Sequence, residues 1–400
     1  MQINLTDDIK KRPEAAEFEN ILQSCVHCGF CNATCPTYQL SGDELDGPRG
    51  RIYLLKQVVE GKPVTQLTVG YLDRCLSCRA CETTCPSGVK YSRLLDLGRS
   101  LLNRKIKRHP YDRMLRFAMR KIFPYPQRFA KILNVVRLFA NFLPGRVPIK
   151  ITGAQSLSEW PEIRHHRKVL LLKGCVQTEL APSIDRAAAC VLDKIGISVQ
   201  VVENSQCCGA LDYHLSAHEA ALQLARHNLD VCWPYIEQGV EAIIMTASGC
   251  GLQLKEYAGI LRYDKQYADK ARHFSNLVKD VSEVLSDEDL SDFKITPRKI
   301  AFQSPCTLQH GQKLAGRVEG ILQGLGFELL PVQDSHLCCG SAGVYSLLQP
   351  TVARQLKDNK LSCLQENGPE LIATANIGCL THLQNDADCR VVHWVELLSE

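Results

Sequence analysis

The chain has 400 residues, of which 45% are hydrophobic and 22% charged, and its net charge at pH 7 is +4. This length exceeds what a single hydrophobic core serves, so we expect two or three domains. There is no run of eighteen apolar residues, and the N-terminus lacks the basic and apolar segments of a signal peptide, which predicts a cytoplasmic protein. Twenty cysteines in such a chain indicate metal ligands rather than disulfides.

Two cysteine runs dominate the first hundred residues. A short helical lead-in is predicted over residues 1–24, with Pro13 near the start of its helix. The runs Cys25–Pro36 and Cys75–Pro86 then both read C-x2-C-x2-C-x3-C-P. This spacing is the ligand pattern of a ferredoxin that carries two 4Fe–4S clusters, in which the fourth cysteine of each run ligates the other cluster. The pattern therefore predicts transfer of single electrons.

Zinc is the alternative metal for these runs, because two C-x2-C pairs can form a four-thiolate zinc site. Each run supplies four cysteines with the same gap and the same proline, which zinc leaves unexplained, so we favour clusters. Between the runs, Gly47–Arg51 predicts a turn, and Ile52–Val59 predicts an amphipathic helix that covers the clusters. Arg49 and Arg51 either offset the negative charge of the clusters or are solvated surface side chains.

The next segment is strongly basic. Between Arg99 and Lys150 there are fourteen Lys and Arg but a single acid, Asp112, so the segment carries +13 and the rest of the chain −9. Two helices are predicted in it, Tyr111–Phe123 and Phe129–Phe142, each with one apolar face. Such helices pack on protein or lie on an anionic membrane, and we favour packing. No nucleic-acid recognition motif accompanies the basic residues, so a nucleic-acid partner is not expected.

The remainder of the chain is an internal duplication. Three cysteine positions recur in near register, two at an offset of 131 residues and one at 129. Each half alternates apolar runs with helical stretches, which predicts a mostly parallel sheet with the cysteines in loops at the carboxyl ends of the strands. The strands are expected near residues 168–172, 197–202 and 240–245 in the first half, and 299–303, 327–332 and 371–374 in the second. Cys232 and Cys363 also match at 131, but within helical stretches, so both are predicted to be buried small hydrophobes.

Taken together, these features resemble a family that joins a two-cluster ferredoxin domain to two cysteine-rich "CCG" domains. The likeness is closest to the iron–sulfur subunits of bacterial glycolate oxidases (glycolate dehydrogenases), in the stretches Ser24–Cys31, Asp46–Arg51 and Cys75–Cys81. It implies a helical ferredoxin-type domain at 1–98, a basic helical linker at 99–165, and α/β CCG domains at 166–290 and 291–400. The overall fold class is thus a multidomain mixture of α+β and α/β parts.

The resemblance also implies the ligand sets. One cluster would be held by Cys25, Cys28, Cys31 and Cys85, and the other by Cys75, Cys78, Cys81 and Cys35. A full CCG motif has five cysteines, but Gln253 and His382 stand at its last position here. The remaining candidates are Cys175, Cys207, Cys208 and Cys250 in the first half, and Cys306, Cys338, Cys339, Cys379 and His382 in the second. Four thiolates can hold a further iron–sulfur cluster or zinc, or a half can keep the fold without metal.

The implied function is that of an electron-transfer subunit in a glycolate and D-lactate dehydrogenase complex. FAD would lie on flavoprotein partner subunits, no catalytic residue is expected on this chain, and the electrons would pass to an acceptor on the quinone side of the membrane. The chain would then lie in the cytoplasm, peripheral to the inner membrane. The alternatives are a subunit of anaerobic glycerol-3-phosphate dehydrogenase, a heterodisulfide reductase-like complex, and a non-catalytic redox or metal sensor.

Overall fold

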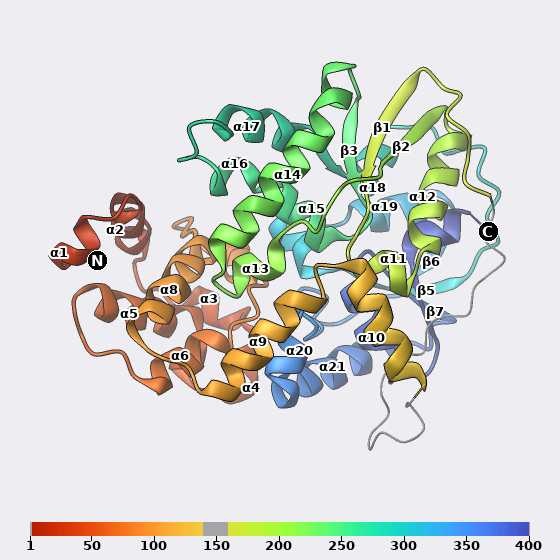
Figure 1. Cartoon of the computed structure of the whole chain (residues 1–400). Helices are drawn as coiled ribbons and strands as arrows, with labels where there is room; N and C mark the ends of the chain where they lie inside the picture. Colours follow the sequence, from red (N-terminus) through yellow and green to blue (C-terminus); the bar gives the residue numbers. More distant parts are fainter. Residues whose placement is uncertain (1, 139–158, 400) are drawn as a thin grey trace. The chain divides into compact units, whose positions relative to one another are not determined.

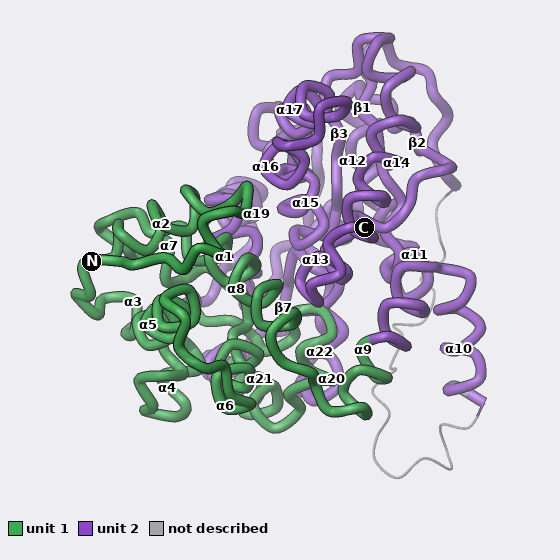
Figure 2. The backbone as a smooth tube through the Cα atoms, turned by 60° about the vertical axis from the view of Figure 1, so that its left-hand side comes forward, with its two compact units in different colours: residues 1–116, 336–360 green, residues 117–335, 361–400 purple. Residues whose placement is uncertain are grey.

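The computed structural model describes residues 2–138 and 159–399, which divide into two compact units (Figures 1 and 2). Unit 1 comprises residues 1–116 and 336–360, and unit 2 comprises residues 117–335 and 361–400. None of the helices in the described ranges is both long and apolar enough to span a bilayer. The domain boundaries predicted at residues 98, 165 and 290 stay a prediction.

Unit 1 is helical. Its elements are α1 (Asp7–Lys10), α2 (Ala15–Ser24), α3 (Phe30–Ala33), α4 (Pro36–Ser41), the 3-10 turn η1 (Glu44–Asp46), α5 (Pro48–Val59), α6 (Gln66–Asp73), α7 (Ala80–Thr84), α8 (Tyr91–Lys105), the start of α9 (Pro110–Ile122), α20 (Tyr345–Leu348) and most of α21 (Pro350–Gln365). The core is built where α2, α5 and α8 bury leucines such as Leu22, Leu55 and Leu94 completely. Several of the cysteines of the two runs pack against this same core.

Helix α5 begins earlier than the sequence suggested. Residues 48–51 were predicted to form a turn, but they are the first turn of the helix, so that prediction is wrong. The physical reason is that Pro48 occupies the first helical position, where its fixed φ suits the helix and its missing N–H costs no hydrogen bond. Extending the helix turns Arg51 inward, where its side chain is completely buried.

Unit 2 contains two parallel four-stranded sheets. The first has the order β2-β1-β3-β4 and the second β6-β5-β7-β8, so the topology is repeated. The strands are β1 (Arg167–Leu172), β2 (Ile197–Val202), β3 (Ala242–Met245), β4 (Val278–Asp280), β5 (Lys299–Gln303), β6 (Glu328–Leu329), β7 (Leu371–Thr374) and β8 (Arg390–His393). All pairings are parallel, with Val169 opposite both Val199 and Ala242. The predicted α/β duplication is thus confirmed, with a fourth strand in each sheet that the sequence did not indicate.

Helices cover the sheets of unit 2, with α12 packed against β2 and α17 against β3 (Figure 1). The helical elements are α10 (Pro126–Leu138), α11 (Gln177–Leu180), α12 (Ser183–Lys194), α13 (Ala210–His214), α14 (His218–Glu237), α15 (Ser248–Lys255), α16 (Tyr257–Ile260), α17 (Ala268–Leu277), α18 (Val281–Leu285), the π-helical turn η3 (Thr307–Gly311), α19 (Arg317–Gly324), α22 (Ile377–Gln384) and the 3-10 turn η4 (Trp394–Leu398). The predicted continuation of α10 to Phe142, and the rest of the basic segment up to Lys150, lie outside the described residues.

Candidate metal centres

The two cysteine runs share an unusual backbone. His27 and Ser77 occupy equivalent positions between the first two cysteines, and both have positive φ, 57° and 55°. Gly29 and Arg79 are equivalent as well, with φ of 85° and 64°, and each caps the short helix that follows. Positive φ is uncommon for residues other than glycine and persists where the surrounding structure requires it. The repetition shows that the two runs have the same backbone conformation around their first three cysteines.

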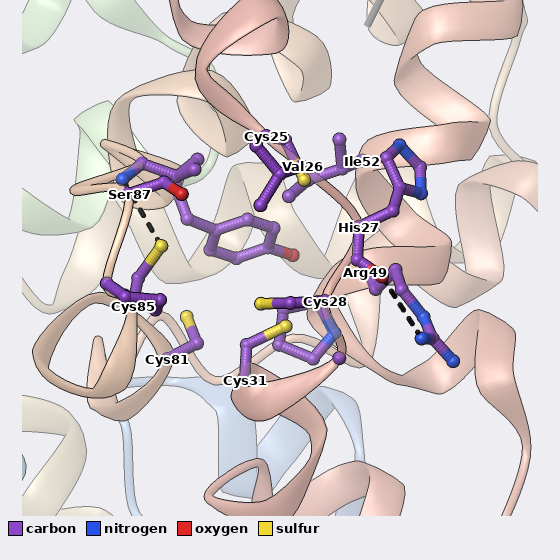
Figure 3. A pocket seen from close by; sticks show the side chains of 15 residues that line it. Cys25, Val26, His27, Cys28, Cys31, Arg49, Ile52, Cys81, Cys85 and Ser87 are labelled. Carbon is purple, nitrogen blue, oxygen red and sulfur yellow. Dashed lines mark hydrogen bonds between the residues drawn. The ribbon is translucent and has the colours of Figure 1, made fainter.

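A cavity lies at the first run, with about 430 Å³ of unfilled space counting its open mouth. Figure 3 shows the sulfurs of Cys28 and Cys31 on one side of it, with Cys81 and Cys85 opposite. The five cysteines that line it are Cys25, Cys28, Cys31, Cys81 and Cys85. The structure therefore brings together all four predicted ligands of one cluster, with Cys81 of the other set beside them.

The chemistry of this donor set fits an iron–sulfur cluster. Burial raises the pKa of Cys31 to about 11, so this thiol would not ionise alone at neutral pH. Backbone N–H groups nevertheless point at the sulfurs. The N–H of Arg49 donates to the sulfur of Cys31, and the N–H of Val89 donates to the sulfur of Cys85 at 3.5 Å. Cationic iron supplies the charge that stabilises buried thiolates, and hydrogen-bond donors stabilise them further. A bound cluster would thus stabilise the thiolate form of these buried cysteines and give the N–H donors charged sulfurs as acceptors.

The second predicted set is more deeply enclosed. Burial raises the pKa of Cys81 well above its usual value, and the negative charges of Cys78, Cys75, Glu82 and Cys35 raise it further. The backbone N–H of Ser77 and the hydroxyl of Tyr91 donate to the sulfur of Cys75 at 3.5 and 3.7 Å.

Hydroxyl groups and arginines complete the surroundings of this set. The hydroxyl of Thr37 lies 3.3 Å from the sulfur of Cys35 and accepts a hydrogen bond from Arg51. Arg99 donates to the carbonyl of Cys75 at 2.8 Å. The solvated-surface interpretation is wrong for Arg51, whose side chain is completely buried, and compensation of cluster charge stays a prediction. Arg49 lines the first cavity, is half-exposed and pairs with Glu44. Sequence reasoning missed Thr37, Tyr91 and Arg99 as neighbours of the sulfurs. The only available signal for Thr37 was its place directly after the Cys–Pro pair.

In the first CCG half, four thiols form a chain of contacts. Cys207 hydrogen-bonds to Cys175 and Cys208, and Cys208 also hydrogen-bonds to Cys250. Because its two neighbours donate to it, the pKa of Cys208 is lowered well below its usual value despite burial. The fully buried Asn228 donates to the carbonyl of Cys207, and the Tyr257 hydroxyl donates to that of Cys208. These two hydrogen bonds fix the carbonyl groups of the Cys207–Cys208 loop, and Cys208 lies at the centre of the chain of thiols.

The predicted residues of the second half are placed as follows. Cys306 follows β5 and is half-buried, whereas Cys338, Cys339 and Cys379 are buried. The backbone N–H of Gly340 donates to the sulfur of Cys338, and Asn376 donates to that of Cys379, both at 3.5 Å. Across all the described residues, including both cysteine runs and both CCG halves, no three His, Cys, Asp or Glu side chains are placed so that they could hold a single metal ion.

The two residues at the position of the fifth family cysteine lie on equivalent helices. Gln253 is on α15, buried, with no hydrogen-bond partner for its Nε2, and His382 is half-buried on α22. Cys232 is buried as predicted, but Cys363 is only half-buried, so the prediction is wrong for Cys363. The reason is that the helix after the second Cys-Cys-Gly is shifted by one residue relative to the first half. Gly209 packs on Ala221 whereas Gly340 packs on Ala353, so the structural equivalent of Cys232 is Leu364 and not Cys363.

Comparison with known proteins agrees with this organisation. Residues 21–89 match the family model described as "4Fe-4S dicluster domain", and residues 169–255 and 300–384 match the one described as "Cysteine-rich domain". The chain is 52% identical to the glycolate oxidase iron-sulfur subunit of Escherichia coli, covering 100% of this chain and 99% of that protein. It is 28% identical to the probable glycolate oxidase iron-sulfur subunit of Bacillus subtilis, covering 99% and 96%.

More distant matches cover less or share only the fold. Lactate utilization protein A of Bacillus subtilis is 25% identical over 58% of this chain and 99% of its own length. The crystal structure of a hypothetical protein from Helicobacter pylori aligns with a TM-score of 0.56 at 10% identity, covering 96% of this chain and 71% of that one. At this identity the structural match speaks for the fold alone.

Proposed function

Because the chain belongs to the family of glycolate oxidase iron–sulfur subunits, we propose that it carries electrons in a complex that oxidises glycolate to glyoxylate and also accepts D-lactate. The observation that carries this proposal is the enclosure of eight cysteines, in two repeated runs, within one helical unit. The family model implies two 4Fe–4S clusters for this region. When bound, each would accept and release one electron at a time.

The residues of this chain would hold and insulate the two clusters. Cys25, Cys28, Cys31 and Cys85 would ligate one, and Cys75, Cys78, Cys81 and Cys35 the other. Oxidation of glycolate releases two electrons and two protons, which FAD on flavoprotein partner subunits would accept together. This chain would then pass the two electrons on singly, towards an acceptor on the quinone side of the membrane.

Co-purification separates this assignment from its closest alternative. The tagged chain, expressed with its native neighbours, should retain flavoprotein subunits that reduce a dye with glycolate and D-lactate. If the assembled complex instead oxidised glycerol 3-phosphate and left glycolate untouched, the assignment would be wrong. The architecture would then serve the alternative dehydrogenase.

Helix α10 supports a peripheral membrane contact as part of this proposal. Its exposed face combines apolar and basic side chains, with Ile132 41%, Val135 56% and Leu138 74% exposed beside Arg128 and Lys131. A helix of this kind binds an anionic interface through both apolar burial and charge. The sequence favoured packing on protein for this segment, and Phe129 and Leu133 of the same helix are buried in that way, whereas the three apolar side chains named above remain exposed in the described chain.

We expect the full chain to co-sediment with vesicles that contain anionic phospholipid, and to bind less as salt is raised. The double variant Ile132→Ser and Val135→Ser should lose most of this binding. Leu67→Ser, which changes a still more exposed apolar residue on α6, is the control and should bind like the parent chain. Equal binding by all three proteins would contradict the membrane contact.

The first CCG half is proposed to hold a thiolate-bound metal centre on Cys175, Cys207, Cys208 and Cys250. Removing the central thiol with Cys208→Ser should lower the iron or zinc content of the anaerobically purified chain. Cys190→Ser, at a half-buried cysteine on α12, is the matched control and should leave both metals unchanged. If elemental analysis showed the same iron and zinc in all three proteins, this half would keep the fold without metal.

A further inference from the structure

The two predicted cluster sites of unit 1 differ in the charge buried around them. The site of Cys35, Cys75, Cys78 and Cys81 is bordered by two enclosed guanidinium groups, those of Arg51, 0% exposed, and Arg99, 8% exposed. Lysine and arginine are almost never fully buried unless a partner compensates their charge. The hydrogen bonds of the two arginines therefore show how much of their positive charge the protein itself compensates.

Arg51 is compensated in part. Its Nη2 donates to Asp46 at 3.2 Å, but the same carboxylate oxygen accepts from Arg74 at 2.7 Å, so one acid serves two arginines. Its Nη1 donates to Thr37, whose hydroxyl lies 3.3 Å from the sulfur of Cys35. This arrangement leaves net positive charge next to a predicted ligand.

Arg99 has only neutral acceptors among its hydrogen bonds. It donates to the carbonyl of Leu72 and to that of Cys75, both at 2.8 Å, and to the hydroxyl of Ser77 at 3.2 Å. These acceptors belong to the loop that carries the first cysteines of the second run. The hydroxyl of Tyr91, which is itself buried, donates to the sulfur of Cys75. The carboxylate of Asp73 also interacts electrostatically with Arg99. That acid is already paired with Arg108 and Arg116, so it compensates the guanidinium charge only in part.

The surroundings of the other site are nearly neutral and open to water. Arg49 lines its cavity and forms a two-pronged pair with Glu44 through bonds of 2.6 and 3.0 Å, with a longer bond of 3.4 Å to the carbonyl of His27. Cys28 is exposed, and Val26 beside it is 67% exposed. A paired and partly exposed charge is screened by solvent, so it acts weakly on its neighbours.

We propose that the cluster held by Cys35, Cys75, Cys78 and Cys81 has the higher reduction potential of the two, so that an electron entering this chain settles there. The inference rests on the proposed function and its two clusters. Reduction adds a negative charge, which nearby buried cations and hydrogen-bond donors to sulfur stabilise. Burial alone would oppose the added charge, but we expect the two guanidinium groups and the Tyr91 hydroxyl, which donates to the sulfur of Cys75, to outweigh it. Arg51, Arg99 and Tyr91 are therefore residues that raise the reduction potential of this cluster without ligating it.

An EPR-monitored redox titration of the anaerobically purified full chain tests this. The parent protein should show two one-electron waves from the two clusters. Arg99→Gln and Tyr91→Phe should each shift the higher-potential wave to lower potential and leave the other wave in place. Arg99→Lys keeps the positive charge, so its higher-potential wave should lie close to that of the parent protein. The iron content of each variant shows whether both clusters are still bound.

The matched control is Arg93→Gln on the same helix, because the guanidinium group of Arg93 pairs with the carboxylate of Glu17 on α2. It should leave both waves unchanged. A shift of the lower-potential wave by Arg99→Gln, or an equal shift of both waves, would overturn the proposal. The titration uses a chemical reductant and no glycolate. If the complex failed to oxidise glycolate, the proposed function would be wrong, but the order of the two cluster potentials could still be read from the titration.

Discussion

The variant Cys78→Ser is expected to lose one of the two clusters, lowering the ferredoxin-type iron from about eight to about four per chain. Cys78 is half-buried and belongs to the set around Cys35, Cys75 and Cys81. A serine hydroxyl ionises far less readily than a thiol, so it cannot replace a thiolate ligand at neutral pH. Electron flow from glycolate to the natural acceptor should stop, because the relay would be interrupted. Oxidation of glycolate by the flavoprotein partners, followed with an artificial dye, should remain measurable.

Iron and sulfide analysis with EPR of the reduced chain provides the measurement. Cys363→Ser is the matched control, since Cys363 is another half-buried cysteine and lies on α21 outside every proposed ligand set. It should keep the full iron content and the full electron flow. If Cys78→Ser retained all its iron and both EPR signals, the assignment of Cys78 as a ligand would be wrong.

The second large effect is expected from Gly50→Ala. A Cβ at Gly50 would lie 2.1 Å from the carbonyl oxygen of Glu44 and 2.9 Å from the Cα of Leu45, both of which are backbone atoms. Helix α5 can therefore approach the turn η1 only because this residue has no side chain. Overpacking of this kind costs roughly 1–3 kcal/mol in free energy of unfolding. The displaced turn also carries Asp46, so the ion pairs of Arg51 and Arg74 should weaken as well.

Gly70→Ala is the control for this change. Gly70 lies within α6, and its added Cβ would meet only the flexible end of Arg74, at 3.6 Å. Alanine in a helix interior is favoured over glycine by about 0.5–1 kcal/mol, so this variant should be as stable as the parent or slightly more stable. Denaturant unfolding of the three proteins, each with its iron content measured, gives the comparison. Equal midpoints for Gly50→Ala and Gly70→Ala would show that α5 and η1 are not tightly packed.

The sequence was informative where chemistry requires a fixed spacing or a repeated order. The two cysteine runs are recognisable because a cluster needs thiolates at set intervals, and the α/β halves because their apolar runs repeat with the cysteines. Strands β4 and β8 escaped notice because neither is an apolar run, since β4 contains Lys279 and Asp280 and β8 begins at Arg390 and ends at His393. Their pairing with β3 and β7 comes from tertiary packing, which local composition does not report.

Long-range packing also explains what the sequence missed at the candidate site. Arg99 was counted only as part of a basic segment, yet it is buried and donates to the carbonyl of Cys75, 24 residues earlier. Arg51 is turned inward by a helix that begins at Pro48, where local residue preferences had suggested a turn. The buried positive charge that we propose as the cause of the difference between the two cluster potentials therefore depends on tertiary packing and cannot be recognised in the sequence.

The most direct test of the central claim is to add glycolate anaerobically to the complex of this chain with its flavoprotein partners and to record EPR spectra of the frozen sample. We predict that glycolate alone elicits the signals of reduced 4Fe–4S clusters, and that these signals diminish in the Cys78→Ser complex. A complex in which glycolate bleaches the flavin but leaves the clusters oxidised, although dithionite reduces them, would contradict an electron-transfer role for this chain.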